Sequence, residues 1–154
     1  MGAAREGPGP GQWTGEANMV GRAAVLGDGG WGTAIAILLA EKQEEVTVWG
    51  VEETYTARVQ ESRANPRFLP NVALPPGLRF TSDPEEAAAG AAVLFSVIPT
   101  QFLRSALGRF EPWLGPETVV VSCSKGLEEG TGLLPTQVVG ELLAPPGPLV
   151  VLSG

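Results

Sequence analysis

The sequence predicts an α/β protein with a doubly wound, mainly parallel sheet of six strands and helices on both faces. Short apolar runs alternate with segments of helical periodicity along most of the chain. Most of these runs are apolar throughout rather than at every second residue, as in strands that are buried on both faces. The 154 residues, 44% of them hydrophobic, are enough to bury one core, which indicates one domain.

The expected elements follow one another in order along the chain. The expected strands are residues 23–27, 46–49, 78–81, 92–97, 119–123 and 149–152. The expected helices are residues 31–41, 52–63, 84–89, 101–110 and 133–143. The third helix has clear local signals, with Asp83 as the N-cap, Pro84 at the first helical position and Glu86 completing a capping pair. Residues 65–77 contain four prolines, which exclude a regular helix, and are expected to form a functional loop.

Composition limits where the chain acts and what it binds. Residues 1–22 are rich in Gly and Pro and are expected to form a flexible tail before a domain at 23–154; they lack the apolar core of a signal peptide. The apolar stretches are shorter than the ~20 residues that cross a bilayer. A net charge of −7 argues against a nucleic-acid partner. The single cysteine, Cys123, is expected to be a buried strand residue, and a chain with no internal disulfide is typical of the cytoplasm.

The most informative motif is the glycine cluster GDGGWG at residues 27–32, which matches G-x-G-x-x-G between the expected first strand and first helix. In this setting the pattern is typical of the turn of a Rossmann-type, dinucleotide-binding domain. Gly27 would allow the tight turn, Gly29 the close approach of a pyrophosphate, and Gly32 the packing of helix on strand. Free N–H groups at the helix N-terminus would hold the phosphates. One alternative is a plain strand–helix turn without a ligand. A separate alternative concerns Trp31, which would then be a simple packing residue.

The end of the second strand bears on the choice between NAD and NADP. Val51, Glu52 and Glu53 follow it, and residues 43–57 contain no Arg, Lys or His. A 2′-phosphate would find no cation in this stretch and would meet carboxylates instead, which favours NAD. Alternatively, both glutamates only open the next helix, where their charge suits its N-terminus.

The other strand ends supply further candidates, because the carboxyl ends of parallel strands meet at the ligand-binding edge. The fourth strand is followed by IPTQF, the fifth by SKG and the sixth by the terminal SG. Lys125 of SKG is one of two lysines and would hold a substrate oxygen or phosphate electrostatically. A surface lysine paired with Glu128 or Glu129 is the alternative.

Five segments together resemble a known family: VLGDGGWGTAIAILLA, NPRFLPNVALPPGLRFTSDPEEA, VIPTQFLR, VSCSKGLEEGTGLLPTQVVGELL and VVLSG. In order and spacing they are similar to the NAD(P)-dependent glycerol-3-phosphate dehydrogenases over nearly all of residues 23–154. The resemblance implies the NAD-binding domain of an oxidoreductase that interconverts sn-glycerol 3-phosphate and dihydroxyacetone phosphate. That reaction supplies the glycerol phosphate backbone of phospholipids.

The resemblance also implies roles for single residues. The glycine motif would bind the pyrophosphate, Val51 would contact the adenosine half of the cofactor, and Phe102 would lie near the nicotinamide. Lys125 would touch both cofactor and substrate, and Gly154 would meet the substrate. The implied cofactor contacts are Gly27, Asp28, Gly29, Gly30, Trp31, Gly32, Val51, Phe102 and Lys125. No metal site is implied.

Two departures from the family pattern affect these expectations. Asp28 stands where the family usually has Ala or Ser, and a carboxylate would weaken pyrophosphate binding unless it pointed away. The sequence ends at Gly154, whereas the family has a helical C-terminal domain with the lysine that acts as general acid/base. The chain is therefore expected to be inactive alone, with Lys125 as an electrostatic assistant, and to belong to a homodimeric enzyme. A non-catalytic dinucleotide-binding module and a related reductase of the same fold are the alternatives.

Overall fold

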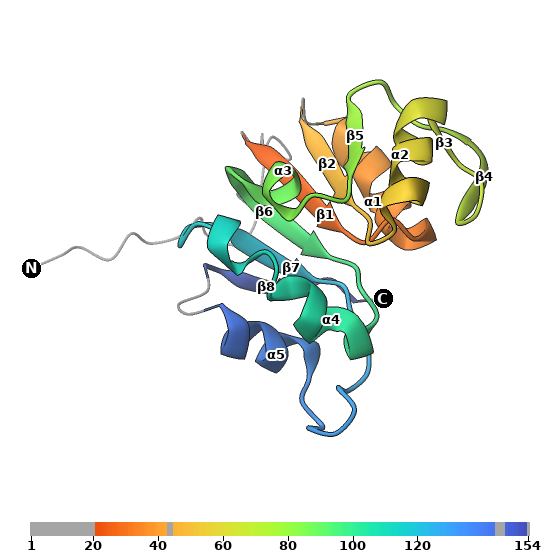
Figure 1. Cartoon of the computed structure of the whole chain (residues 1–154). Coiled ribbons are helices and arrows are strands. Elements are labelled where there is room, and N and C mark those ends of the chain that lie inside the picture. The colour runs from red at the N-terminus through yellow and green to blue at the C-terminus, as the bar shows by residue number, and fades with distance from the viewer. Residues whose placement is uncertain (1–20, 43–44, 144–146, 154) are drawn as a thin grey trace, which may run out of the picture.

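A six-stranded parallel sheet runs through the centre of the molecule (Figure 1). The computed structural model describes residues 21–42, 45–143 and 147–153. In this part of the chain the sheet strands are β1 (Arg22–Leu26), β2 (Val46–Trp49), β5 (Leu78–Thr81), β6 (Ala91–Ser96), β7 (Val119–Ser122) and β8 (Leu149–Val151). They lie in the order β5-β2-β1-β6-β7-β8, and every neighbouring pair is parallel. This order is the 3-2-1-4-5-6 arrangement of a doubly wound nucleotide-binding sheet, so the predicted fold class is confirmed.

The helices agree with the expected ranges apart from their ends. They are α1 (Gly30–Ala40), α2 (Glu53–Ser62), α3 (Pro84–Ala88), α4 (Thr100–Leu107), α5 (Pro135–Leu142) and a 3₁₀ turn, η1 (Glu111–Trp113). The fourth helix ends earlier than expected, because Gly108 caps it and Pro112 lies in the 3₁₀ turn that follows. Asp83 caps α3 as predicted and accepts a hydrogen bond of 2.8 Å from the Glu85 N–H. Glu86 does not complete the capping pair, since its carboxylate accepts from the Thr81 hydroxyl at 2.6 Å.

Two expectations near the ends and in the proline-rich segment need adjustment. Most of the expected tail, residues 1–20, lies outside the described residues, and Arg22 already belongs to β1. The segment expected as a loop contains an antiparallel pair, β3 (Ala64–Asn65) with β4 (Leu69–Ala73). A two-stranded sheet has only edge strands, and an edge strand tolerates a proline such as Pro70.

Two apolar clusters fill the space on either side of the sheet. One joins β1 residues Ala24 and Leu26 to α3, α4 and α5, and the other joins Ala23 and Val25 to α1 and α2. Figure 1 shows α4 on the near side of the sheet and α1 behind it. Cys123 is buried, as predicted, but it lies directly after β7 rather than within the strand; burial raises the pKa of its thiol. No helix in the described part of the chain is long and apolar enough to span a bilayer.

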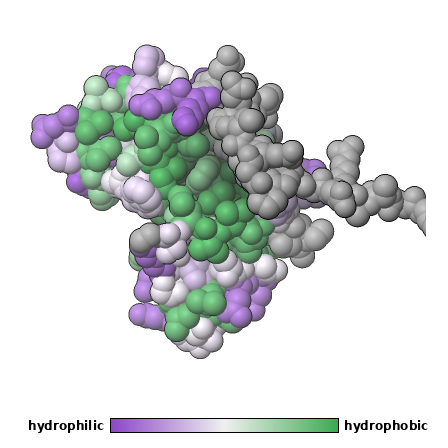
Figure 2. Space-filling view, turned by 180° about the vertical axis from the view of Figure 1, so that it is seen from behind, coloured by the Kyte–Doolittle hydropathy of each residue, from purple (hydrophilic) through white to green (hydrophobic). Residues whose placement is uncertain are grey.

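The face turned away from α4 also carries exposed apolar surface. Strand register aligns Phe95, Val121 and Val150, so these side chains share one face of β6, β7 and β8. Val150 is 46% exposed on this face. Seen from behind, hydrophobic side chains gather over a broad area of the molecule (Figure 2). Of the three aligned side chains, Val121 is buried and Phe95 is partly buried.

Candidate functional site

A cavity of about 770 Å³ lies at the carboxyl edge of the sheet, where β1, β2 and β6 end. After β1 the chain goes to β2 on one side, whereas β6 pairs with β1 on the other, so this is the point at which the strand order reverses. Open α/β sheets bind ligands at this point, and the volume is typical of a small-molecule site. The cavity is lined by Gly27, Asp28, Gly29, Gly30, Trp31, Gly32, Trp49, Val51, Phe68, Val97, Ile98, Pro99, Phe102, Ser105, Ala106 and Arg109.

Large apolar side chains surround the cavity without being buried. Trp31 is 58% exposed, Val51 73% and Phe102 63%. The sequence predicts all three as cofactor contacts, and the structure brings them together around this cavity. Trp31 is therefore not a core residue, which removes its interpretation as simple packing. Phe68, which the sequence did not single out, joins them from the segment between β3 and β4. Exposed apolar side chains around a cavity are typical of a ligand site.

The glycines of the motif differ in whether the fold has room for a side chain at their positions. Gly27 has a φ of +117°, and a Cβ there would lie 2.6 Å from the Val97 carbonyl oxygen. A Cβ on Gly32 would overlap the Gly27 carbonyl, so these two glycines are required by the packing of β1, β6 and α1. A Cβ on Gly29 would meet nothing within 4 Å. Gly29 thus leaves open space beside the start of α1 that the fold itself does not use.

The N-terminus of α1 has the geometry of an anion-binding site. Gly29 is its N-cap and, lacking a side chain, makes no side-chain capping bond, while the Thr33 N–H donates to the Gly29 carbonyl at 2.9 Å. The N–H groups of the first turn have no acceptor within the helix. They form the positive end of the helix dipole. An apolar cavity with these N–H groups at one wall fits a phosphate-containing ligand.

The Asp28 side chain turns toward the end of β2. A Cβ on Gly50, the residue after β2, would overlap the Asp28 carboxylate and the Thr56 hydroxyl. Burial raises the pKa of Asp28, although hydrogen bonds from its own backbone and from Thr56 and the charge of Arg67 act in the opposite direction. The departure from the family pattern therefore places a partly buried carboxylate at the strand end.

A buried amide that the sequence did not single out holds the glycine loop in place. Asn65 donates from Nδ2 to the Asp28 carbonyl and to Thr33 Oγ1, both at 2.8 Å. Its Oδ1 accepts from the Tyr55 hydroxyl at 2.6 Å, which ties the loop to α2. The only signal in the sequence was an Asn before Pro66, which is common in turns and does not reveal a buried partner.

Two expected loop ends lie next to one another at the same edge. The Thr100 hydroxyl donates to the Lys125 carbonyl, and the Ser124 hydroxyl donates to the Ile98 carbonyl, both at 2.6 Å. The exposed Lys125 side chain does not line the cavity. Glu128, which the alternative interpretation paired with Lys125, accepts two hydrogen bonds of 2.9 Å from Arg104. Gly154 lies outside the described residues.

Charged groups near the end of β2 are arranged differently from the expectation. Glu52 is the N-cap of α2 and Glu53 lies in its first turn, as the alternative interpretation held. Glu52 pairs with Arg67 at 2.7 Å, which lowers the pKa of Glu52. Arg109 lines the cavity and lies over the Trp49 ring, 5.3 Å from its centroid. Residues 43–57 contain no cation, but tertiary structure brings Arg67 and Arg109 to this strand end from outside that stretch, so the argument from the local sequence does not extend to the folded site.

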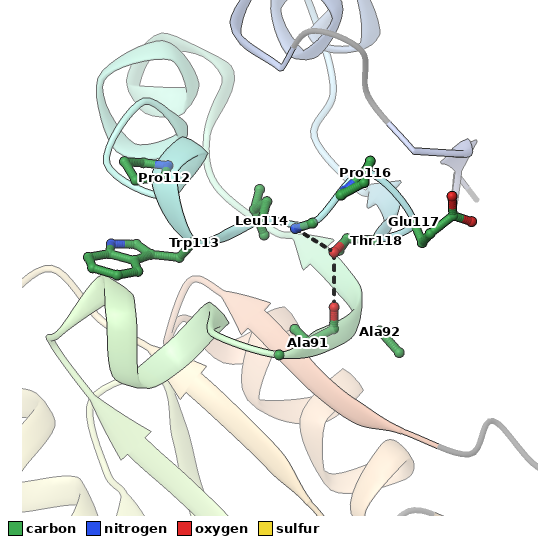
Figure 3. Close-up of a pocket in the computed structure, with 10 residues that line it drawn as sticks. Ala91, Ala92, Pro112, Trp113, Leu114, Pro116, Glu117 and Thr118 are labelled. Carbon is green, nitrogen blue, oxygen red and sulfur yellow. Dashed lines mark hydrogen bonds between the residues drawn. The ribbon is translucent and has the colours of Figure 1, made fainter.

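A second hollow, of about 520 Å³, lies at the opposite edge, where β6 and β7 begin (Figure 3). The Thr118 hydroxyl donates to the Ala91 carbonyl at 3.0 Å and accepts from the Gly115 N–H at 3.2 Å. These bonds close the turn before β7 and give Thr118 a structural role. Over residues 21–42, 45–143 and 147–153 no group of three or more His, Cys, Asp or Glu could hold a metal ion. The first cavity is thus the candidate site.

Comparison with known proteins identifies the family. Residues 22–154 match the family model described as the N-terminus of NAD-dependent glycerol-3-phosphate dehydrogenase. The chain belongs to this family. It is 42% identical over 134 residues to glycerol-3-phosphate dehydrogenase [NAD(P)+] of Streptomyces griseus, covering 86% of this chain and 40% of that protein. It is 43% identical over 138 residues to the glycosomal NAD(+) enzyme of Trypanosoma brucei brucei, covering 86% of this chain and 39% of that protein.

Solved structures agree with this assignment. The crystal structure of glycerol-3-phosphate dehydrogenase from Coxiella burnetii matches with a TM-score of 0.80 and 31% identity, over 87% of this chain and 41% of that one. A ketopantoate reductase from Ralstonia eutropha matches at a TM-score of 0.64 and 19% identity, over 86% of this chain and 40% of that one, which shows the fold alone. The chain spans about 40% of the length of the dehydrogenases that it matches.

Proposed function

We propose that this chain binds NAD and supplies the cofactor-binding part of a glycerol-3-phosphate dehydrogenase. The observation that carries the proposal is the open space at Gly29, beside the first turn of α1 and inside an apolar cavity at the reversal of the strand order. A glycine that the fold does not need, next to N–H groups at a helix start, suits a pyrophosphate.

Each part of the cavity suits a different part of the dinucleotide. The N–H groups at Gly30 and Trp31 would hold the pyrophosphate, and Val51 at the end of β2 would meet the adenosine half. Phe102, on α4, would form the apolar wall beside the nicotinamide. When bound, the nicotinamide ring exchanges a hydride with the substrate carbon.

The substrate pair in this proposal is sn-glycerol 3-phosphate and dihydroxyacetone phosphate. It is the pair that the resemblance to the family implies. Lys125 lies at the same edge of the sheet as the cavity, where its ammonium would attract the substrate oxygen or phosphate. Gly154 would meet the substrate at the end of the segment after β8. The proton donor would come from a further domain, so this chain alone would bind cofactor without turnover.

The same proposal covers partners and location. The apolar face of β6, β7 and β8 suits contact with the catalytic domain of a homodimeric enzyme. The net charge of −7 makes nucleic acid an unsuitable partner. The single cysteine, which is buried, suits the reducing cytoplasm.

A domain exchange tests this function. The chain would replace the corresponding N-terminal part of the Streptomyces griseus enzyme, with which it shares 42% identity. We expect the 154-residue chain alone to bind NADH without oxidising it in the presence of dihydroxyacetone phosphate. The chimera should oxidise NADH, and a chimera with Gly29→Val should not. Turnover by the chain alone at an ordinary rate, or no NADH binding in calorimetry, would contradict the proposal.

A further inference from the structure

The acids that follow β2 do not face the cavity. In this fold the adenosine ribose hydroxyls usually bind an acidic side chain near the end of the second strand. Here Glu52 is engaged by Arg67 at 2.7 Å, and Glu53 is exposed in the first turn of α2. Neither of them lines the cavity, whereas Asp28, from the loop between β1 and α1, does.

The carboxylate of Asp28 lies at the end of β2, although Asp28 belongs to the loop between β1 and α1. Gly50 directly follows β2 and is buried, and a Cβ at Gly50 would overlap both the Asp28 carboxylate and the Thr56 hydroxyl. The next residue, Val51, is exposed and lines the cavity. The carboxylate thus lies over the strand end and beside the residue expected to meet the adenosine half.

The carboxylate has unused capacity to accept hydrogen bonds. The Thr56 hydroxyl beside it has a single proton, which is shared with the Glu52 carbonyl at 2.9 Å. Burial raises the pKa of Asp28 despite Thr56, its own backbone and Arg67, which means that protein groups do not replace all the hydration it has lost. Donors brought by a ligand would be favourable here.

We infer that the Asp28 carboxylate accepts the hydroxyls of the adenosine ribose and so selects a dinucleotide with a free 2′-hydroxyl over one with a 2′-phosphate. This inference rests on the proposed function, since it assigns one end of the same cavity. A 2′-phosphate would place a second anion beside a partly buried carboxylate, where repulsion is weakly screened. Arg109 also lines the cavity, but its guanidinium lies over Trp49, which packs against Phe110 on the α4 side of the sheet.

Calorimetric titration of the 154-residue chain with NADH and with NADPH tests the inference. We expect the wild-type chain to bind NADH at least about tenfold more tightly than NADPH, the effect of one charge-assisted hydrogen bond. Asp28→Asn and Asp28→Ala should reduce this ratio to less than about threefold. Glu53→Gln removes the same charge from the neighbouring helix and should leave the ratio unchanged.

The outcomes separate the inference from the proposed function. An unchanged ratio in both Asp28 variants, or a wild-type chain that binds NADPH as tightly as NADH, would overturn the inference while NADH binding stands. A wild-type preference for NADPH that is lost in Arg109→Gln would assign the selection to Arg109 instead. If the wild-type chain binds neither dinucleotide, the proposed function fails as well. Should one Asp28 variant fail to fold, the ratio measured for the other variant decides the test.

Discussion

At the scale of single residues, glycines of one motif are under different constraints. Gly27 and Gly32 lie where a side chain would collide with backbone, so the fold requires them. Gly29 lies where a side chain would meet open space. The sequence pattern named all three, but only the surroundings of each Cβ separate a glycine kept for folding from one kept for a ligand.

Gly29→Val should therefore affect mainly NADH binding, whereas Gly32→Ala should affect mainly the stability of the fold. We expect Gly29→Val to abolish NADH binding while lowering the free energy of unfolding by no more than about 1 kcal/mol, the usual cost of a poor N-cap. Gly32→Ala should lower it by more than about 3 kcal/mol, because the new methyl group overlaps the Gly27 carbonyl. Urea denaturation and NADH titration measure the two effects. Tight NADH binding by Gly29→Val would count against the pyrophosphate assignment.

Asp28 should lower stability at neutral pH. Burial raises its pKa, so the folded chain holds this proton more tightly than the unfolded chain does. Stability from this group is complete below the unfolded pKa and is lost as pH rises through the folded pKa. Asp28→Asn should therefore raise the thermal midpoint at pH 7, and the gain should shrink toward pH 4. Thermal melts across this range measure it, and a gain that grew on acidification would contradict the cause.

Asn65 should be a stability determinant of the glycine loop. Asn65→Ala leaves the Tyr55 O–H without its acceptor and removes the 2.8 Å bond to the Asp28 carbonyl, which keeps only its 3.2 Å bond from Thr33, at a cost of about 1–3 kcal/mol. Gln101→Ala is the control, because it removes an exposed amide and should change stability by less than about 0.5 kcal/mol. Equal effects of the two substitutions in urea denaturation would show that the buried bonds contribute little.

At the scale of elements, periodicity predicted the strands and helices well, and local chemistry predicted the start of α3. Sequence reasoning was weaker between elements. The β3–β4 pair was expected as a loop, because pairing depends on a partner strand that no local pattern reveals. The role of Glu128 was missed for the same reason, since its partner Arg104 lies 24 positions away on α4.

Arg104 should hold the segment after β7 against α4 and α5. It binds Glu128 in bidentate fashion and Glu141 at 2.7 Å, so Arg104→Lys loses the paired geometry while keeping the charge. We expect faster hydrogen exchange at Gly132, whose N–H donates to the Glu128 carbonyl, with the core strands unchanged. Arg79→Lys, at an exposed position on β5, is the control.

This network should also weaken in acid. Arg104 and Thr131 lower the pKa of Glu128, so its contribution is present above the unfolded pKa of the carboxyl and is lost as pH falls through the folded pKa. The difference in exchange between wild type and Arg104→Lys should therefore shrink on acidification below the ordinary glutamate pKa. A difference that stayed constant would indicate that packing, not charge, holds the segment.

At the scale of the whole molecule, the strand order decides where stability and the site lie. β1 and β6 are central and pair on both sides, whereas β5 and β8 are the edge strands. Four residues of β1 are fully buried, while Val150 and Val151 of β8 are exposed. Stability is therefore expected to be uneven across the sheet.

Hydrogen exchange in the native state measures this unevenness. We expect the slowest amides in β1 and β6, at rates that report global unfolding, and faster exchange in β8 through local opening. NADH should slow exchange at the start of α1 and at the end of β2 more than in β8. Equal protection of β8 and β1 in the chain without ligand would show that the edge strand unfolds only with the whole sheet.

The sequence by itself determined the alternation of strands and helices, the glycine motif and the family, because these depend on local periodicity and on residues close together in the chain. Tertiary structure decided how the site is composed. It brought Asp28 over Gly50, Arg109 over Trp49 and Asn65 under the glycine loop, from separations that no local pattern spans. The physical reason is that charge and hydrogen bonding act through space, so the partner of a side chain depends on which strands become neighbours.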